Sequence, residues 1–312
     1  MGFSVLRCIV RRVRVCVALV AVSAPLAGAD EPNLPQAEPT LPQEPPAAEA
    51  PPPGQPPPAP KEFPGRLAGE LESDFKWSVN NIAQDGIDVV KSPSHAGELL
   101  STPAFYWVTL ASAAALGTAY GLDQPARDQF RHISDKDAGY LESWGTVALF
   151  GTTGVLYGYG LLADEARARQ YALTGLLSAG VSGALTSALK VTFGRDRPRD
   201  NQGHNAWFKG GSSFVSGETT PAFALAADIS EYADNRWYVA LPAYVAAASV
   251  GLGRMGKDAH WLSDITGSAL LGVGTTELLL HMHAMHDVDP NRWRVFPVVM
   301  NHTVGVGMTV AW

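Results

Sequence analysis

Three short loops of the sequence contain the residues whose types and spacing could do chemistry. The loops read KVTFGRDRPRD, SSFVSGETT and GRMGKDAHWLSDITG. Together they supply cations, a small-residue turn and titratable groups, namely Lys190, Arg197, Ser216, Gly217, Glu218, Arg254, His260 and Asp264. Ammonium and guanidinium groups beside the amides of a helix start are the donors that bind a phosphate. The loops therefore point to phosphate chemistry, although each loop alone is weak support.

Each loop also has an ordinary structural explanation. Lys190 and Arg197, flanked by two further arginines, could form a basic helix C-terminus that the helix dipole favours without any ligand. Ser216 could simply cap the helix that follows it. His260 and Asp264 are one helical turn apart, so on a helix they would share a face. The carboxylate could then accept a hydrogen bond from one ring nitrogen while the other nitrogen faces a substrate.

The three loops in this order resemble the pattern of the type 2 phosphatidic acid phosphatase family. That family includes lipid phosphate phosphatases, bacterial class A acid phosphatases and vanadium haloperoxidases, and its pattern is K-x6-R-P, then P-S-G-H, then S-R-x5-H-x3-D. Here the first block is intact from Lys190 to Pro198. The third is intact from Arg254 to Asp264, with Gly253 in place of the serine. Spacing of this kind over three blocks, within residues 171–272, is a specific signal.

The resemblance implies a helical bundle whose loops hold a phosphate, and it implies a role for each matching residue. The phosphate ligands would be Lys190, Arg197, Ser216, the amide of Gly217, and Arg254. His260 would be the nucleophile that forms a phosphohistidine, and Asp264 would orient it. Such a site suits the reaction, because cations stabilise the equatorial oxygens while a neutral imidazole attacks in line.

The middle block departs from the family at two positions, Val215 for proline and Glu218 for histidine. In the family that histidine protonates the leaving oxygen, and a glutamate can do so only if its pKa is raised towards the working pH. Neighbouring cations lower the pKa of Glu218, whereas burial and a bound phosphate dianion raise it. Three readings stay open: Glu218 is the acid, His204 replaces it, or leaving-group protonation is lost. Loss would cost roughly 10²–10⁴-fold in rate, and less for a diphosphate, whose leaving group is itself a phosphate.

Long apolar, Ala- and Gly-rich stretches must position these loops. They cover residues 104–120, 145–163, 171–190, 221–232, 238–253 and 265–283, and their length favours helices over strands. We therefore predict an all-α bundle of about six core helices over residues 101–290. An amphipathic helical lead-in occupies residues 65–100, and it covers either the core or a membrane surface. Residues 291–312 form two Val-rich runs around Asn301-His302, which predicts a short β-hairpin.

The N-terminal residues indicate export. Residues 1–29 have arginines, then an apolar run and a small-residue cleavage site, as in a secretory signal, and residues 30–64 form a Pro-rich spacer. Both cysteines, Cys8 and Cys16, lie in the signal. Removing its four arginines leaves 19 cations against 30 carboxylates, a net charge of −11. A chain this acidic does not look like a nucleic-acid binder.

We therefore predict an exported phosphatase acting on lipid-linked or small phosphomonoesters or diphosphates, without a metal or other cofactor. The alternatives are a non-catalytic envelope protein that binds phosphate and a vanadate-dependent oxidase. We favour a soluble or peripheral periplasmic bundle, because three spanning helices before Lys190 would turn the first loop towards the cytoplasm. A polar helix end explains the histidines of HMHAMHDVD better than a metal site. Trp207 and Phe208 could line a substrate entrance or pack as a lid.

Overall fold

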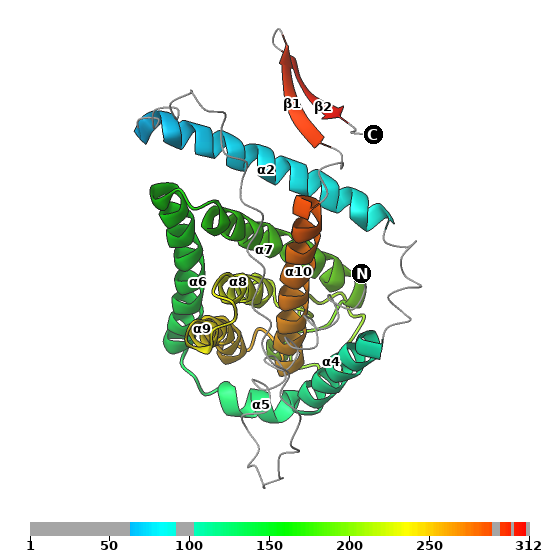
Figure 1. Cartoon of the computed structure of the whole chain (residues 1–312). Coiled ribbons are helices and arrows are strands. Elements are labelled where there is room, and N and C mark those ends of the chain that lie inside the picture. Colours follow the sequence, from blue (N-terminus) through cyan, green and yellow to red (C-terminus); the bar gives the residue numbers. More distant parts are fainter. Residues whose placement is uncertain (1–62, 92–102, 289–293, 301–302, 310–312) are drawn as a thin grey trace, which may run out of the picture.

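The computed structural model describes residues 63–91, 103–288, 294–300 and 303–309, which are almost entirely helical (Figure 1). Its helices are α2 (Phe63–Lys91), α4 (Pro103–Gly121), α5 (Asp123–Phe130), α6 (Asp135–Ala163), α7 (Ala166–Phe193), α8 (Thr219–Tyr232), α9 (Trp237–Gly256) and α10 (Leu262–Val288), with a 3₁₀ turn η2 (Pro198–Asp200). This confirms the predicted all-α bundle, and each of the six apolar stretches lies in a core helix. The sequence analysis did not predict α5, which is short and mostly polar.

Helix α8 lies at the centre of the bundle and packs against α6, α7, α9 and α10 (Figure 1). Its apolar residues are mostly alanine, with Leu225 fully buried among them. The close packing continues where α6 meets α9. A Cβ on Gly145 would lie 2.2 Å from the carbonyl oxygen of Ala246, so only glycine fits at this crossing. Small side chains therefore let five helices share one compact core.

The directions of the core helices gather the three loops at one end of the bundle. Helices α7 and α9 end there, whereas α8 and α10 begin there. The turn out of α7 needs glycine, because Gly194 has φ of 48° and closes the helix with a bond from its N–H to the carbonyl of Lys190. The fold thus places the loop chemistry on helix ends.

Helix α2 lies across the other end of the bundle, near the end of α6 and the start of α7 (Figure 1). Its inward face is polar, with Glu70, Asp74, Asn81, Gln84 and Asp85 buried. Arg169 of α7 contacts the Asp74 carboxylate at 3.1 Å. Its outward face is apolar, since Leu71, Phe75 and Ile82 are each about half exposed. The predicted amphipathic helix is present, but it does not bury its apolar face in the core.

The chain ends in a β-hairpin, as predicted. Strand β1 (Arg294–Met300) pairs antiparallel with β2 (Thr303–Thr309), with Met300 opposite Thr303. The hairpin lies next to α2 (Figure 1). The predicted signal and nearly all of the predicted spacer lie outside the described residues and stay predictions.

Candidate active site

His260 lies just before α10 and is 2 % exposed. Its Nδ1 is 2.8 Å from the carbonyl oxygen of Ser213. A carbonyl only accepts, so Nδ1 carries the hydrogen and a neutral ring keeps its lone pair on Nε2. Burial lowers the pKa of His260, which favours this neutral form. Within the described chain Nε2 has no hydrogen-bond partner. The ring therefore presents a lone pair on Nε2 that no other described group engages by a hydrogen bond.

Asp264 holds the loop around His260 rather than the ring alone. It is fully buried, and its oxygens accept from Ser213 Oγ at 2.5 Å and from Trp261 N at 2.9 Å. The distance to His260 Nδ1 is 3.7 Å. Burial alone would raise the pKa of Asp264, but the nearby His260 ring and the charge of Arg195 lower it. Asp264 is thus ionised and fixes Ser213, whose carbonyl in turn orients His260.

Arg195 joins several elements at this end of the bundle. From the sequence it was expected only to flank Lys190 and Arg197. It is fully buried and bonds Asp264 at 2.5 Å and Asp123 at 2.6 Å. Its guanidinium lies 4.5 Å from the ring centroid of Trp207. Arg195 therefore ties the start of α5 to the start of α10 and does not face the phosphate ligands. No signal in the sequence marks Asp123 as its partner.

The predicted phosphate ligands gather around the start of α8. A Cβ on Gly217 would lie 3.3 Å from Nζ of Lys190, so the ammonium group approaches the turn closely. Arg254 contacts Glu218 at 3.3 Å through Nη2. Arg197 donates from Nη2 to Ser212 Oγ at 3.1 Å and is close enough to feel the charges of Arg254 and Glu218. The structure therefore brings these cations together at one turn.

Ser216 has the capping contact that its ordinary explanation predicts. Its hydroxyl is buried and accepts from Thr219 N at 3.4 Å and from Thr219 Oγ1 at 2.9 Å. The next residues still leave backbone donors at the start of α8. The turn can thus be both a helix cap and one wall of an anion site.

Glu218 lies in the middle of this cluster. One carboxylate oxygen contacts Arg254, and the other lies 3.9 Å from His260 Nε2 and 3.5 Å from Ser216 Oγ. Its side chain is 44 % exposed. Burial alone would raise the pKa of Glu218, but Arg254, His260 and Lys190 outweigh it and lower the pKa. Glu218 is therefore ionised at neutral pH.

Two other candidate residues, His204 and Trp207, serve packing, whereas Phe208 faces the surface. The ring of His204 packs against Tyr120 and Trp261, and Trp207 packs on Arg195. Phe208 is 74 % exposed. Outside the site, His283 is buried and bonds Thr174 of α7 and Asp85 of α2, so it joins these helices and is not part of a solvent-exposed polar helix end. No cluster of three or more metal-ligating side chains occurs in the described ranges.

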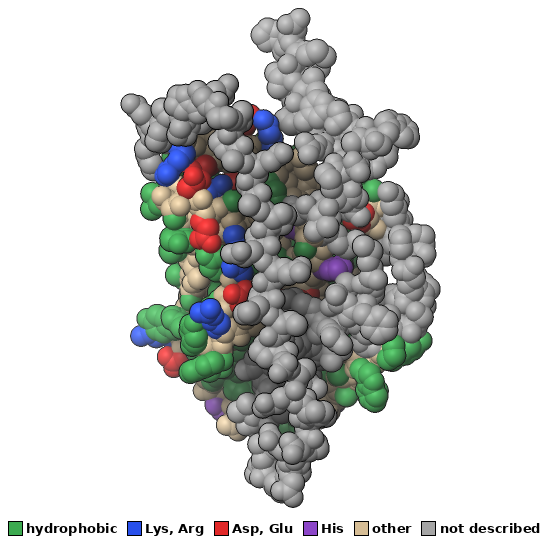
Figure 2. All heavy atoms as spheres, in the orientation of Figure 1, with side chains coloured by type: hydrophobic (Ala, Val, Ile, Leu, Met, Phe, Trp, Pro, Cys, Tyr) green, Lys and Arg blue, Asp and Glu red, His purple; other side chains and the backbone are tan. Residues whose placement is uncertain are grey.

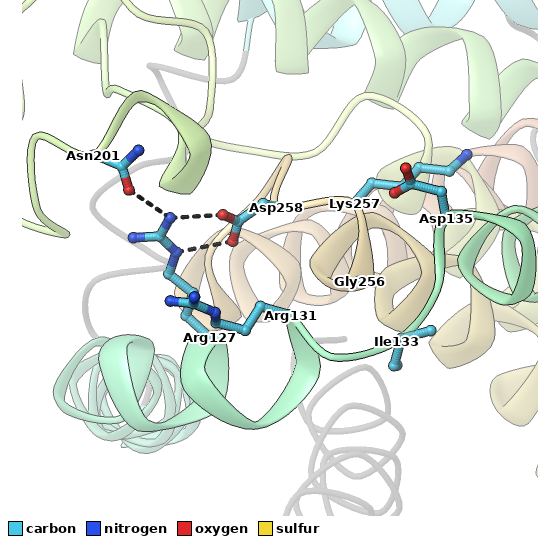
Figure 3. A pocket seen from close by; sticks show the side chains of 8 residues that line it. All are labelled: Arg127, Arg131, Ile133, Asp135, Asn201, Gly256, Lys257 and Asp258. Atoms are coloured by element: carbon cyan, nitrogen blue, oxygen red, sulfur yellow. Dashed lines mark hydrogen bonds and ion pairs between the residues drawn. The ribbon is translucent and has the colours of Figure 1, made fainter.

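A polar hollow of about 390 Å³ lies beside the loop that carries His260 (Figure 3). Arg127 of α5 forms two bonds to the Asp258 carboxylate, at 2.9 and 2.6 Å, and a third to Asn201. Lys257 pairs with Glu142 at 2.6 Å. These contacts anchor Lys257 and Asp258, shortly before His260 in the chain. The loop around His260 is thus held by these ion pairs and by those of Arg195.

Comparisons with known proteins agree with this geometry. Residues 171–287 match the sequence model of the PAP2 superfamily. A lipid A 1-phosphatase of Porphyromonas gingivalis is 32% identical over 103 residues, which is 33% of this chain and 21% of that protein. The chain therefore matches about a fifth of the length of this curated relative. No solved structure matches.

Proposed function

We propose that the chain, whose residues 171–287 match the PAP2 superfamily, hydrolyses a phosphomonoester or diphosphate through a phosphohistidine on His260. One observation carries the proposal. The buried, neutral His260 has an Nε2 without a hydrogen-bond partner in the described chain, and this atom lies 3.9 Å from the Glu218 carboxylate that Arg254 contacts.

In the proposed reaction the phosphoryl group lies between Lys190, Arg197, Arg254 and the amide of Gly217. Nε2 of His260 attacks phosphorus, and the bond from phosphorus to the leaving oxygen breaks, with its electron pair going to that oxygen. Nδ1–H continues to donate to the Ser213 carbonyl and stabilises the positive charge of the ring. Water then attacks phosphorus and gives up one proton, which the Glu218 carboxylate can accept. The P–N bond breaks with its electron pair returning to Nε2, and neutral His260 is restored.

The proton for the leaving oxygen can come from Glu218 once a phosphate dianion is bound beside it. In the free protein this carboxylate is ionised, so Glu218 donates only after the bound dianion has raised its pKa. The packing of His204 against Tyr120 and Trp261 makes that residue the weaker candidate. A diphosphate needs this proton least, which makes diphosphates suitable substrates.

The name of the relative and the surface of the bundle support a lipid-linked substrate at a membrane. The helices α6 and α9, and the segment Ala166–Asp200 that contains α7, are long and apolar enough to span a bilayer. Figure 2 shows hydrophobic side chains along the edge where α6 and α9 lie. On α6, large exposed side chains run from Tyr140 to Leu162, roughly 33 Å at about 1.5 Å per residue, against a hydrocarbon core of about 30 Å.

The number of candidate spans removes one argument for a soluble protein. That argument assumed three spanning helices up to the first loop. The candidate spans up to that loop are two, namely α6 and the segment Ala166–Asp200 that itself carries Lys190, and α4 is not among them. Two spans return the chain to the side from which it started. An exported chain can thus place the catalytic loops outside, and we propose a membrane-bound phosphatase of the cell envelope.

A second candidate is a non-catalytic phosphate-binding protein, which the contact of Glu218 with Arg254 favours. Phosphate release from a panel of lipid-linked and small phosphates, with and without orthovanadate, separates the two. We expect release by the parent chain and inhibition by vanadate. His260→Ala should lose turnover and the acid-trappable phosphoenzyme, with its helical circular dichroism unchanged. Turnover by His260→Ala at the parent rate would refute the mechanism.

A further inference from the structure

The Glu218 carboxylate lies where the proposed reaction needs the phosphoryl group. It contacts Nη2 of Arg254 at 3.3 Å, and its second oxygen is 3.9 Å from the nucleophilic Nε2 of His260. In-line attack requires phosphorus to approach the nucleophile to about 3–3.5 Å, with its equatorial oxygens on the surrounding cations. The carboxylate and the phosphoryl oxygens would then overlap in space and repel each other.

We infer that Glu218 occupies the phosphate seat of the free protein as an internal anion and that the substrate must displace it from Arg254. This inference rests on the proposed function. The carboxylate is free to leave, because its side chain is 44 % exposed and belongs to the first residue before α8. Arg254 would keep its bond to Glu142 through Nη1, at 3.3 Å, and present Nη2 to the phosphate.

The charges around Glu218 make its displacement costly. Arg254 of α9, Lys190 of α7, Arg197 of the loop after α7, and His260 before α10 face it. Arg254 and Lys190 lower the pKa of Glu218, so it competes as an anion throughout the neutral range. Phosphate affinity therefore depends on the protonation of Glu218, and the competition from its carboxylate is relieved only as the pH falls below 4.5, the ordinary value of the carboxyl, because the pKa of Glu218 is lowered.

The test measures the binding of inorganic phosphate to the full chain by calorimetry, for the parent, Glu218→Gln and Glu218→Ala. Glu218→Gln removes the charge but keeps the shape, and Glu218→Ala removes both. We expect both variants to bind phosphate roughly tenfold or more tightly than the parent at about pH 8, since a charge-assisted bond no longer has to be broken. The advantage should shrink as the pH is lowered. The titration of phosphate itself is common to all three proteins and cancels in the comparison.

Glu72→Gln is the matched control, because it removes an exposed carboxylate on α2, far from the site. It should leave the affinity unchanged. Equal or weaker binding by both Glu218 variants, with turnover of the parent intact, would overturn the internal anion and leave the proposed phosphatase standing. No phosphate binding by any of the proteins would overturn the phosphate seat and, with it, the proposed function.

Discussion

Protonation of a single residue, His260, should set the acid limit of activity. Its ring must be neutral to attack, and burial lowers its pKa from the ordinary value of 6.5. We therefore expect kcat/KM to stay high below pH 6.5 and to fall only as the pH passes through the lowered pKa. The charge of Glu218 raises the pKa of His260, so Glu218→Gln should move this acid-side fall in kcat/KM to still lower pH. If kcat/KM of the parent were instead lost on acidification with a midpoint above pH 6.5, this assignment would be contradicted.

The identity of the leaving group should reveal whether Glu218 is an acid. Glutamine cannot donate a proton to a departing alkoxide, so Glu218→Gln should lose far more activity on alkyl phosphates than on aryl phosphates or diphosphates. The expected loss on alkyl phosphates is roughly 10²–10⁴-fold. Steady-state rates on the three substrate types measure it. Equal losses on all three would instead mean that Glu218 gives no proton, and Glu218→His should then raise activity.

Most side chains of the site could be predicted from the sequence, but its backbone groups could not. Spacing in the three loops predicted Lys190, Gly217, Arg254 and His260, and the structure brings them together. The carbonyl of Ser213 could not be predicted, because any residue supplies the same atom and only the fold aims it. The buried pair of Arg195 and Asp123 was missed for a related reason, since its partners are 72 residues apart.

Among the elements, the crossing of α6 and α9 depends on one small residue. Gly145→Ala would place a methyl group 2.2 Å from the carbonyl of Ala246 and 2.5 Å from Ser249 Oγ. The helices must then separate, which we expect to cost about 1–3 kcal/mol of unfolding free energy. Gly151→Ala, on the same helix with nothing within 4 Å, is the control and should be neutral or stabilising by about 0.5–1 kcal/mol. Thermal unfolding in detergent measures both, and equal melting temperatures would disprove the tight crossing.

Sequence periodicity located the elements well but not which way each one faces. Six apolar stretches became core helices, because their length exceeds that of buried strands. The periodicity of α2 showed two faces, yet it could not tell that Arg169 would bind Asp74 and turn the apolar face outward. That orientation depends on ion pairs across 95 residues of chain. Local patterns carry no information at that distance.

For the whole molecule, the decisive question is whether the bundle crosses the bilayer, and α6 provides the test. Cysteines at Lys136, Val155 and Ala163 would report the start, the exposed apolar middle and the end of this helix. Replacement of Cys8 and Cys16, the two cysteines of the chain, by serine leaves each variant with one thiol. A membrane-impermeant maleimide is then applied to either side of sealed vesicles.

If α6 spans the membrane, Lys136→Cys and Ala163→Cys react from opposite sides, and Val155→Cys reacts from neither. The catalytic loops must lie on the side from which Lys136→Cys reacts, because α6 begins at their end of the bundle. Reaction of all three thiols from one side would instead make the protein peripheral, since a water-exposed bundle hides none of these positions.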